Sequence, residues 1–249
     1  KFAWCVIQCA WQATCSRFVE IYAAASMTFR VDPGLIPAAP DLAFEFALWE
    51  NGLESVAGID EAGRGAWAGP VTAAVVVFPA YFALPQNLVF IRDSKQLSAE
   101  KRTALEPLIK QKAMAWSVGW ASNQEIDCLG ILPATRLAMT RALELLKLTP
   151  QHLLIDALFI PEYPCGQTGL LKGDQRALSI AAASILAKTA RDKFMEAFAS
   201  KISGYAFERN KGYGTRAHQA ALSSHGPCSA HRFSYAPVKR SLKKQQVEG

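Results

Sequence analysis

The chain has 249 residues, of which 51% are hydrophobic and 19% are charged. This composition is typical of a chain with a packed core and excludes a wholly disordered protein, and since no stretch holds about 18 consecutive apolar residues the sequence predicts no membrane-spanning helix. The formal net charge is +6, and residues 201–249 alone carry 9 basic and 2 acidic side chains, which indicates either a polyanionic partner or a solvated basic tail.

Residues 1–26 differ from the rest of the chain. The sequence begins at Lys1, residues 2–16 carry no charge, and Ala-Ala-Ala-Ser follows at 23–26. A secretory signal peptide is one interpretation of this pattern. Because three cysteines and two charged residues are untypical of such a signal, we favour an N-terminal extension upstream of a natural start at Met27, and we expect a cytoplasmic protein.

From Met27 onward, apolar segments predict an α/β fold. Five short apolar segments, some of them rich in β-branched residues, predict buried strands. They lie at 55–60, 71–78, 116–121, 153–156 and 170–171. Helical periodicity and N-cap residues predict helices within 42–49, at 98–112 with Pro107 kinking or splitting it, from Ser122, at 131–147, at 174–200 and at 215–225. Residues 239–249 predict a disordered tail. Since the strands come first and helices crowd the last third, we expect a mixed sheet followed by a helical C-terminal part.

Acidic residues stand where buried apolar segments end. Asp60 and Glu61 close the first predicted strand, Asp156 closes the fourth, and Asp174 opens the longest predicted helix. Each has a purely structural interpretation as a cap or a turn residue. If the two strands are neighbours, however, four carboxylates converge on one edge of the sheet without counter-ions, an arrangement typical of sites that hold hard cations. The pattern favours two Mg²⁺ ions, about 3.5–4 Å apart, that clamp a phosphate.

Two further patterns bear on this site. Adjacent strand residues point to opposite faces, so Asp60 and Glu61 face one site only if the strand ends between them, and the glycines that follow favour such an ending. The helix expected from Asp174 also has a polar stripe that ends in two cations. The members of that stripe are Asp174, Ala177, Ala181, Ser184, Lys188 and Arg191.

Two glycine-rich segments favour contact with a nucleic acid. Gly63-Arg64-Gly65 lets backbone groups approach a ligand closely, with Arg64 beside a phosphate. In the second segment Tyr213 stands between glycines beside a helix N-terminus, where a tyrosine stacks on a base or sugar and the helix favours phosphate. A simple surface turn is an alternative interpretation of either segment.

The chain has six cysteines, and no two of them form a C-x-x-C pair. Their spacing therefore indicates neither a zinc site nor a disulfide framework. His225, Cys228 and His231 form an H-x-x-C-x-x-H pattern that has metal-ligand chemistry. A fourth ligand is missing nearby, so we expect no structural zinc there.

These motifs resemble those of type 2 ribonuclease H, ribonuclease HII, over about residues 55–239. The matching segments, in family order and at family-like spacing, are 58–65, 68–71, Asp93-Ser94-Lys95-Gln96-Leu97, Lys172-Gly173-Asp174, 179–188, Arg191-Asp192, 211–215 and His231-Arg232. The resemblance implies an α/β, ribonuclease H-like fold in which a five-stranded mixed sheet is flanked by helices. It places the catalytic domain at 27–200 and a helical C-terminal part with a basic tail at 201–249.

The resemblance also implies an activity. Ribonuclease HII is a metal-dependent endonuclease that hydrolyses the RNA strand of RNA–DNA hybrids and cuts on the 5′ side of single ribonucleotides embedded in duplex DNA, with roles in ribonucleotide excision, replication and repair. Two Mg²⁺ or Mn²⁺ ions are implied as cofactors, and a monomer without an obligate protein partner or a membrane is expected.

Matching positions carry implied roles. Asp60, Glu61, Asp156 and Asp174 are implied as catalytic metal ligands. Gly63, Arg64 and Gly65 are implied as readers of the 2′-hydroxyl, and Tyr213 as the residue that packs against the adjoining deoxyribose. Candidates for phosphate contacts or for support of the metal ligands are Lys95, Ser184, Lys188 and Arg191.

The chain departs from the family after the third acid, where the family usually has glycine and this chain has Ala157. Alanine adopts a positive φ only at a cost. The family often has a small residue or proline at position 66 and a small or aliphatic residue at position 67, where this chain has Ala66 and Trp67. A non-catalytic nucleic-acid-binding module is the alternative function, although such a module has no need of four acids.

Overall fold

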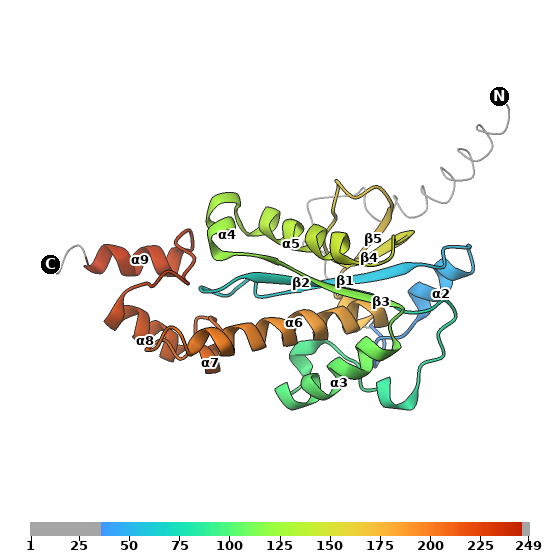
Figure 1. Ribbon diagram of the computed structural model, residues 1–249, viewed down its shortest axis with the longest axis horizontal. Coiled ribbons are helices and arrows are strands. Elements are labelled where there is room, and N and C mark those ends of the chain that lie inside the picture. The colour runs from blue at the N-terminus through green and yellow to red at the C-terminus, as the bar shows by residue number, and fades with distance from the viewer. Residues whose placement is uncertain (1–35, 246–249) are drawn as a thin grey trace, which may run out of the picture. The chain divides into compact units, whose positions relative to one another are not determined.

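The computed structural model describes residues 36–245 (Figure 1). The predicted extension at residues 1–26 and the proposed start at Met27 lie outside the described residues. Within them, no helix is both long enough and apolar enough to cross a membrane. The proposed boundary between residues 200 and 201 stays a prediction.

A five-stranded mixed sheet forms the centre of the fold, as predicted. Its strands are β1 (Val56–Ala62), β2 (Val71–Val77), β3 (Ala115–Ala121), β4 (His152–Asp156) and β5 (Gly166–Leu170). They stand in the order β3-β2-β1-β4-β5. The β1–β2 and β2–β3 pairs are antiparallel, whereas the β1–β4 and β4–β5 pairs are parallel. The ends of β1 and β4 therefore point the same way.

Helices cover both faces of the sheet (Figure 1). One face packs against α6 (Leu178–Ala199), with α2 (Ala43–Trp49) and α3 (Ala99–Lys112) completing that layer. The other face packs against α4 (Asn123–Leu129) and α5 (Ile131–Leu145). Every residue of β2 is buried, because its β-branched and small side chains fill both layers.

A glycine lets α6 lie close to the central strand. A Cβ placed on Gly58 of β1 would lie 2.2 Å from the backbone carbon of Ser179 in α6. The same helix presents a run of small residues, Ala181, Ala182 and Ala183, all completely buried. Close packing at this point brings the middle of α6 next to the residues that follow Gly58 in β1, including Asp60.

Three predicted N-caps are confirmed. The side chain of Ser98 accepts a hydrogen bond from the Lys101 amide at the start of α3. Ser122 and Glu125 form a reciprocal capping box at the start of α4, and Thr215 caps α8 (Arg216–His225). Pro107 lies inside α3 and does not split it, because Leu105 and Ile109 on either side of it are buried against the core and the helix tolerates one missing hydrogen bond.

The prediction of one helix over 174–200 is wrong at its beginning. Asp174 lies in a short 3₁₀ helix, η4 (Gly173–Gln175), and α6 begins only at Leu178 because Ala177 has extended backbone angles. The amide of Ser179 donates instead to the Glu45 carboxylate of α2 at 2.9 Å. The cap therefore comes from a residue 134 positions away, which no local sequence pattern reveals.

The helical C-terminal part is confirmed, but the prediction of a disordered tail is wrong for residues 239–245, whereas residues 246–249 lie outside the described residues. Helices α7 (Phe207–Asn210), α8 and α9 (Ala236–Gln245) follow α6, and the last of these occupies much of the segment expected to be disordered. Val238 explains the difference, since it is completely buried and anchors α9. Two further 3₁₀ turns, η2 (Gln86–Leu88) and η3 (Ser94–Gln96), precede α3.

Candidate active site

The four predicted acids lie at one end of the two central parallel strands. Ile59 of β1 stands opposite Ile155 of β4, so Asp60 and Asp156 are the next residues on neighbouring strands. The Gly173 amide donates to the Asp156 carboxylate at 2.8 Å, which holds η4 and its Asp174 against the end of β4. Three segments far apart in sequence thus bring their carboxylates together.

The expected end of the first strand between Asp60 and Glu61 is wrong. β1 continues to Ala62, because β2 still pairs with it there, although pairing with β4 stops at Ile59. The buried residues that alternate along β1 place Asp60 on the α6 face and Glu61 on the α5 face. Beyond the end of the β4 pairing, the two carboxylates remain close enough for their charges to interact.

Burial and mutual repulsion dominate the electrostatics of these acids. Burial first, then the charges of Glu61 and Asp156, raise the pKa of Asp60 well above its usual range, with a hydrogen bond from Ser184 acting in the opposite direction. Burial, then the charges of Asp93 and Asp156, raise the pKa of Asp174 to about 7. Burial also raises the pKa of Glu61 and of Asp156. Negative charge is therefore in excess at this end of the sheet.

Two basic side chains border the acids. Arg64 Nη1 lies 3.0 Å from Glu61 Oε1, and Lys95 Nζ lies 3.7 Å from Asp174 Oδ2. Partial burial lowers the pKa of Lys95, but the charges of Asp174 and the neighbouring acids outweigh it and raise that pKa. The Lys95 side chain is 78% exposed, so its charged amine is accessible to a ligand.

The donor set fits a divalent cation. Four carboxylates supply hard oxygen ligands, and the buried Oε2 of Glu61 has no hydrogen-bond partner. In the present side-chain positions, no three His, Cys, Asp or Glu residues of the described chain are arranged to hold a metal ion. Because Arg64 and Lys95 each pair with one of the acids, metal binding at this site involves a change in these side-chain contacts.

A glycine loop lies beside the acids. Gly63 has a φ of +94°, and a Cβ there would lie 2.0 Å from Arg191 Nε, so this glycine is required for packing. Gly65 is exposed and a Cβ there would meet nothing within 4 Å. One glycine of the motif therefore anchors the loop, while the other leaves its backbone open to a ligand.

Two buried arginines hold this loop against the C-terminal part. Arg191 of α6 is completely buried and donates to the carbonyls of Pro70, Lys211 and Ala68 at 2.9–3.0 Å. Arg232, also completely buried, donates to the carbonyls of Gly69, Arg64 and Pro70. Arg191 thus supports the loop from inside the protein and presents no donor to solvent. The sequence analysis placed Arg232 in one of the family motifs but predicted no role for it.

The other secondary candidates divide between buried and accessible positions. Ser184 is buried, and its hydroxyl lies 2.8 Å from that of Ser94. Lys188 Nζ bonds to Asp192 at 2.6 Å and lies 5.3 Å from the centre of the Tyr213 ring. The half-buried Tyr213 also has the Arg191 guanidinium at 5.3 Å. Lys95 is the member of this group that reaches solvent most freely.

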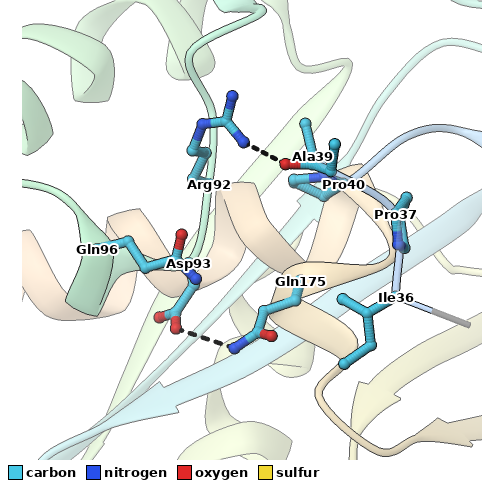
Figure 2. Close-up of a pocket in the computed structure, with 9 residues that line it drawn as sticks. Ile36, Pro37, Ala39, Pro40, Arg92, Asp93, Gln96 and Gln175 are labelled. Atoms are coloured by element: carbon cyan, nitrogen blue, oxygen red, sulfur yellow. Dashed lines mark hydrogen bonds between the residues drawn. The ribbon is translucent and has the colours of Figure 1, made fainter. Parts of the chain in front are cut away.

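Asp93 is a fifth acid that sequence reasoning left without a role. Its buried carboxylate accepts from the Lys95 amide at 2.9 Å and from Gln175 Nε2 at 3.4 Å (Figure 2). It also contributes to the raised pKa of Asp174. Figure 2 shows Asp93 among the residues that line a small pocket, together with Arg92 and Gln175. The pocket has a volume of about 50 Å³, and Arg92 donates to the Ala38 carbonyl beside it at 2.6 Å. The only signal in the sequence was its place at the head of the Asp93–Leu97 motif.

Solved structures define the class of this fold. Ribonuclease H2 from Pyrococcus horikoshii superimposes with a TM-score of 0.63 at 24% identity, covering 77% of this chain and 99% of that one. Ribonuclease HII from Archaeoglobus fulgidus, solved with PCNA, gives 0.61 at 24% identity over 78% and 100%. A Bst ribonuclease HIII solved with Mn²⁺ gives 0.57 at 18% identity over 90% and 77%. The fold is ribonuclease H-like, as predicted.

Sequence comparison narrows the class to a family. Ribonuclease HII of Desulfitobacterium hafniense is 50% identical over 198 residues, which is 80% of this chain and 75% of that protein. That of Moorella thermoacetica is 47% identical over 193 residues, 78% of this chain and 92% of that protein. The family model described as Ribonuclease HII matches residues 57–238. The chain belongs to the ribonuclease HII family, whose members are metal-dependent endoribonucleases.

Proposed function

We propose that this chain hydrolyses the RNA strand of RNA–DNA hybrids and cuts on the 5′ side of a single ribonucleotide embedded in duplex DNA. The observation that carries the proposal is the meeting of four carboxylates, from β1, β4 and η4, beside an open glycine loop. The acids are suited to phosphodiester hydrolysis, and the loop is suited to reading the sugar next to the bond that is cut.

The catalytic residues in this proposal are Asp60, Glu61, Asp156 and Asp174. Their oxygen ligands and excess of negative charge suit two divalent cations, either Mg²⁺ or Mn²⁺. When bound there, such ions supply an activated water and neutralise charge at the departing 3′-oxygen. The protein itself holds the carboxylates in place through the Gly173 amide and the Ser94–Ser184 hydroxyl pair.

The glycine loop reads the 2′-hydroxyl in this proposal, and the hydrogen bonds within the loop support one of its peptide groups over the others. The Arg64 carbonyl already accepts from Arg232 Nη1 at 2.9 Å and from the Tyr235 hydroxyl at 2.6 Å, so both of its lone pairs are used. Gly65 is exposed and its flank is open. We therefore assign the hydroxyl contact to the backbone of Gly65, with the Arg64 side chain directed at a phosphate.

Tyr213 places the neighbouring sugar. The centre of its ring lies 5.3 Å from both Lys188 Nζ and the Arg191 guanidinium, and the side chain stays half-buried beside these cations. A flat surface at this position sets the register of the duplex relative to the acids. In this proposal the enzyme is a cytoplasmic monomer, and it cleaves without a second protein.

Cleavage of three duplexes tests the proposal. One duplex carries a single ribonucleotide, the second an all-RNA strand against DNA, and the third is all DNA. We expect cutting of the first two with Mg²⁺ or Mn²⁺, no cutting of the third, and complete loss with a chelator. Tight binding to all three without any cutting would favour the non-catalytic nucleic-acid-binding module instead.

A further inference from the structure

A pair of buried histidines lies directly behind Tyr213. His218 of α8 and His231, which follows α8 in sequence, are both completely buried, and their Nε2 atoms lie 3.0 Å apart. The rings of Tyr205 and Phe207 pack edge-on or tilted against them. The sequence pattern His225–Cys228–His231 drew attention to this region, but His218 and not His225 pairs with His231.

The shortest hydrogen bonds favour one arrangement of protons on a neutral pair. His218 Nδ1 lies 2.9 Å from the Tyr213 carbonyl, which only accepts, so His218 carries its proton on Nδ1 and its Nε2 is an acceptor. His231 must then donate from Nε2. Its Nδ1 lies 3.0 Å from the Cys228 amide, which only donates, and 3.2 Å from both the thiol and the carbonyl of Cys228; with Nε2 protonated, Nδ1 accepts from the amide, the shortest of these contacts. Donors therefore run in one direction, from Cys228 to the carbonyl of Tyr213.

This chain of bonds ends on the backbone of the residue proposed to read the sugar. The Tyr213 carbonyl also accepts from the Thr215 amide at 2.8 Å, and the Tyr213 amide donates to the Asn210 carbonyl at 2.8 Å. Both peptide groups of Tyr213 are thus held. With the backbone fixed, the direction of the Cα–Cβ bond is fixed too, and rotation about χ1 and χ2 is limited by the contacts of the ring with Lys188 and Arg191.

The same histidine pair connects Tyr213 to the glycine loop. His231 forms an isolated antiparallel bridge with Ala68, and the amides of Trp67 and Ala68 both donate to the Gly212 carbonyl. The two sugar-reading elements therefore share one hydrogen-bonded block, and the histidine pair lies inside it.

We infer that His218 and His231 are positioning residues that set the orientation of Tyr213 through a directed, uncharged chain of hydrogen bonds. The inference rests on the proposed role of Tyr213. Burial lowers the pKa of both histidines, that of His231 to about 4 with the further effect of His218, so the pair stays neutral at physiological pH. Facing Nε2 atoms at hydrogen-bond distance also leave no space for a metal ion between them.

Two substitutions of His218 separate positioning from packing. His218→Phe fills the space but removes the bond to Tyr213 and leaves the Nε2 proton of His231 without an acceptor. His218→Asn places an amide donor where Nδ1 stood and keeps the bond to Tyr213 alone. We expect His218→Phe to slow single-turnover cleavage at an embedded ribonucleotide by about tenfold or more, because small displacements near a reacting centre are costly. We expect His218→Asn to recover most of that loss, with duplex affinity changed by less than about twofold in both variants, since phosphate contacts set affinity.

A double-mutant cycle with Tyr213→Ala identifies the route of the effect. If the histidines act through the tyrosine, His218→Phe slows cleavage in the wild-type background and has little further effect in the Tyr213→Ala background. If the rate losses of the two single variants multiply in the double variant, or if His218→Phe is fully active, the inference is overturned, while the proposed nuclease activity is unaffected. A fully active Tyr213→Ala would instead remove the proposed role of the tyrosine, and the absence of cleavage by the wild type would remove the proposed function.

A spectroscopic measurement on the unaltered protein decides the matter even where His218→Phe does not fold. Long-range ¹H–¹⁵N correlation spectra distinguish the two ring nitrogens of each histidine. We expect a proton on Nδ1 of His218 and on Nε2 of His231, unchanged from about pH 8 down to about pH 7. The opposite tautomers, or a charged pair in this range, would contradict the directed chain.

Discussion

Ala157 is the residue at which the chain departs most informatively from its family. It follows the third acid, adopts a φ of +52°, and donates its amide to the Leu170 carbonyl at 3.0 Å. The left-handed conformation therefore survives in a residue that disfavours it, because the backbone must turn to leave Asp156 at the end of β4. Lys172, shortly before the fourth acid, has a φ of +54°. Backbone strain thus lies beside two of the four acids.

Ala157→Gly tests this strain. A left-handed alanine costs about 1–2 kcal/mol relative to its ordinary conformation, and glycine avoids most of that cost. We expect the substitution to raise the free energy of unfolding by about 0.5–1 kcal/mol in urea denaturation, without loss of activity. The control is Ala220→Gly, at an exposed site inside α8, which should lower the same free energy by about 1 kcal/mol. If both substitutions destabilise the protein equally, Ala157 is unstrained.

Asp174 links the electrostatics of the site to the stability of the metal-free protein. Its folded pKa of about 7 lies above the ordinary value of 3.8, so the folded state holds a proton that the unfolded state releases. The stability that this proton contributes is present at about pH 4 and is lost as the pH rises through about 7. Asp174→Asn has no such proton to lose. With a chelator present, its advantage in unfolding free energy over the wild type should grow from near zero at about pH 4 to roughly 1–3 kcal/mol at about pH 8. An advantage that does not change with pH would contradict the repulsion described here.

Helices and strands with a strong local sequence pattern were predictable. Those whose bounds depend on contacts with distant parts of the chain were not. Val71–Val77 is β-branched and bounded by prolines, and the structure has it as β2. β5 begins at Gly166, four residues before the predicted strand, because Gly-Gln-Thr-Gly carries little apolar pattern and gains its place from pairing with β4. The start of α6 depends on Glu45, and α9 depends on the burial of Val238. Long-range contacts decided each of these.

The same distinction applies to the candidate site. The four acids were predictable because each one stands at the end of an apolar segment. Asp93 and Arg232 were not assigned roles, since their partners lie 82 and 168 positions away, at Gln175 and Arg64. The opposite orientations of Asp60 and Glu61 depend on how far β2 pairs with β1, and no local pattern specifies that length.

Removal of part of α9 tests whether this element contacts nucleic acid. Deleting residues 240–249 removes three basic residues and one acidic residue. If the basic residues contact phosphates, affinity should fall equally for all duplex sequences, and the slope of log affinity against log salt should decrease by about 0.9 for each lost contact. A deletion of residues 246–249 is the control, because it removes Glu248 and no basic residue. Equal slopes for both deletions would show that this part of the chain is only solvated.

At the scale of the whole molecule, α6 connects the acids to the glycine loop and Tyr213, which are proposed to read the sugar. Its 22 residues extend about 33 Å. Its first turn receives the Glu45 cap, Ser184 lies next to Asp60, and Arg191 holds the glycine loop and the Lys211 carbonyl. One rigid helix thus sets the distance between the acids and Tyr213. Asp60 and Asp174 are buried, while the C-terminal part that follows α6 carries 9 basic and 2 acidic side chains, an excess of positive charge that favours a polyanionic partner.

The central proposal is that the carboxylates at the ends of β1 and β4 form an active site that cleaves nucleic acid at a ribonucleotide. The most direct test is single-turnover cleavage of a duplex with one ribonucleotide in Mg²⁺, comparing the wild type with Asp60→Asn and measuring duplex affinity alongside. We predict that the wild type cuts only on the 5′ side of the ribonucleotide and leaves a 3′-hydroxyl. Asp60→Asn should bind within about twofold of the wild type, yet cut slower by a factor on the order of a thousand. Cleavage by Asp60→Asn at the wild-type rate, or an intact duplex after incubation with the wild type, would contradict the claim.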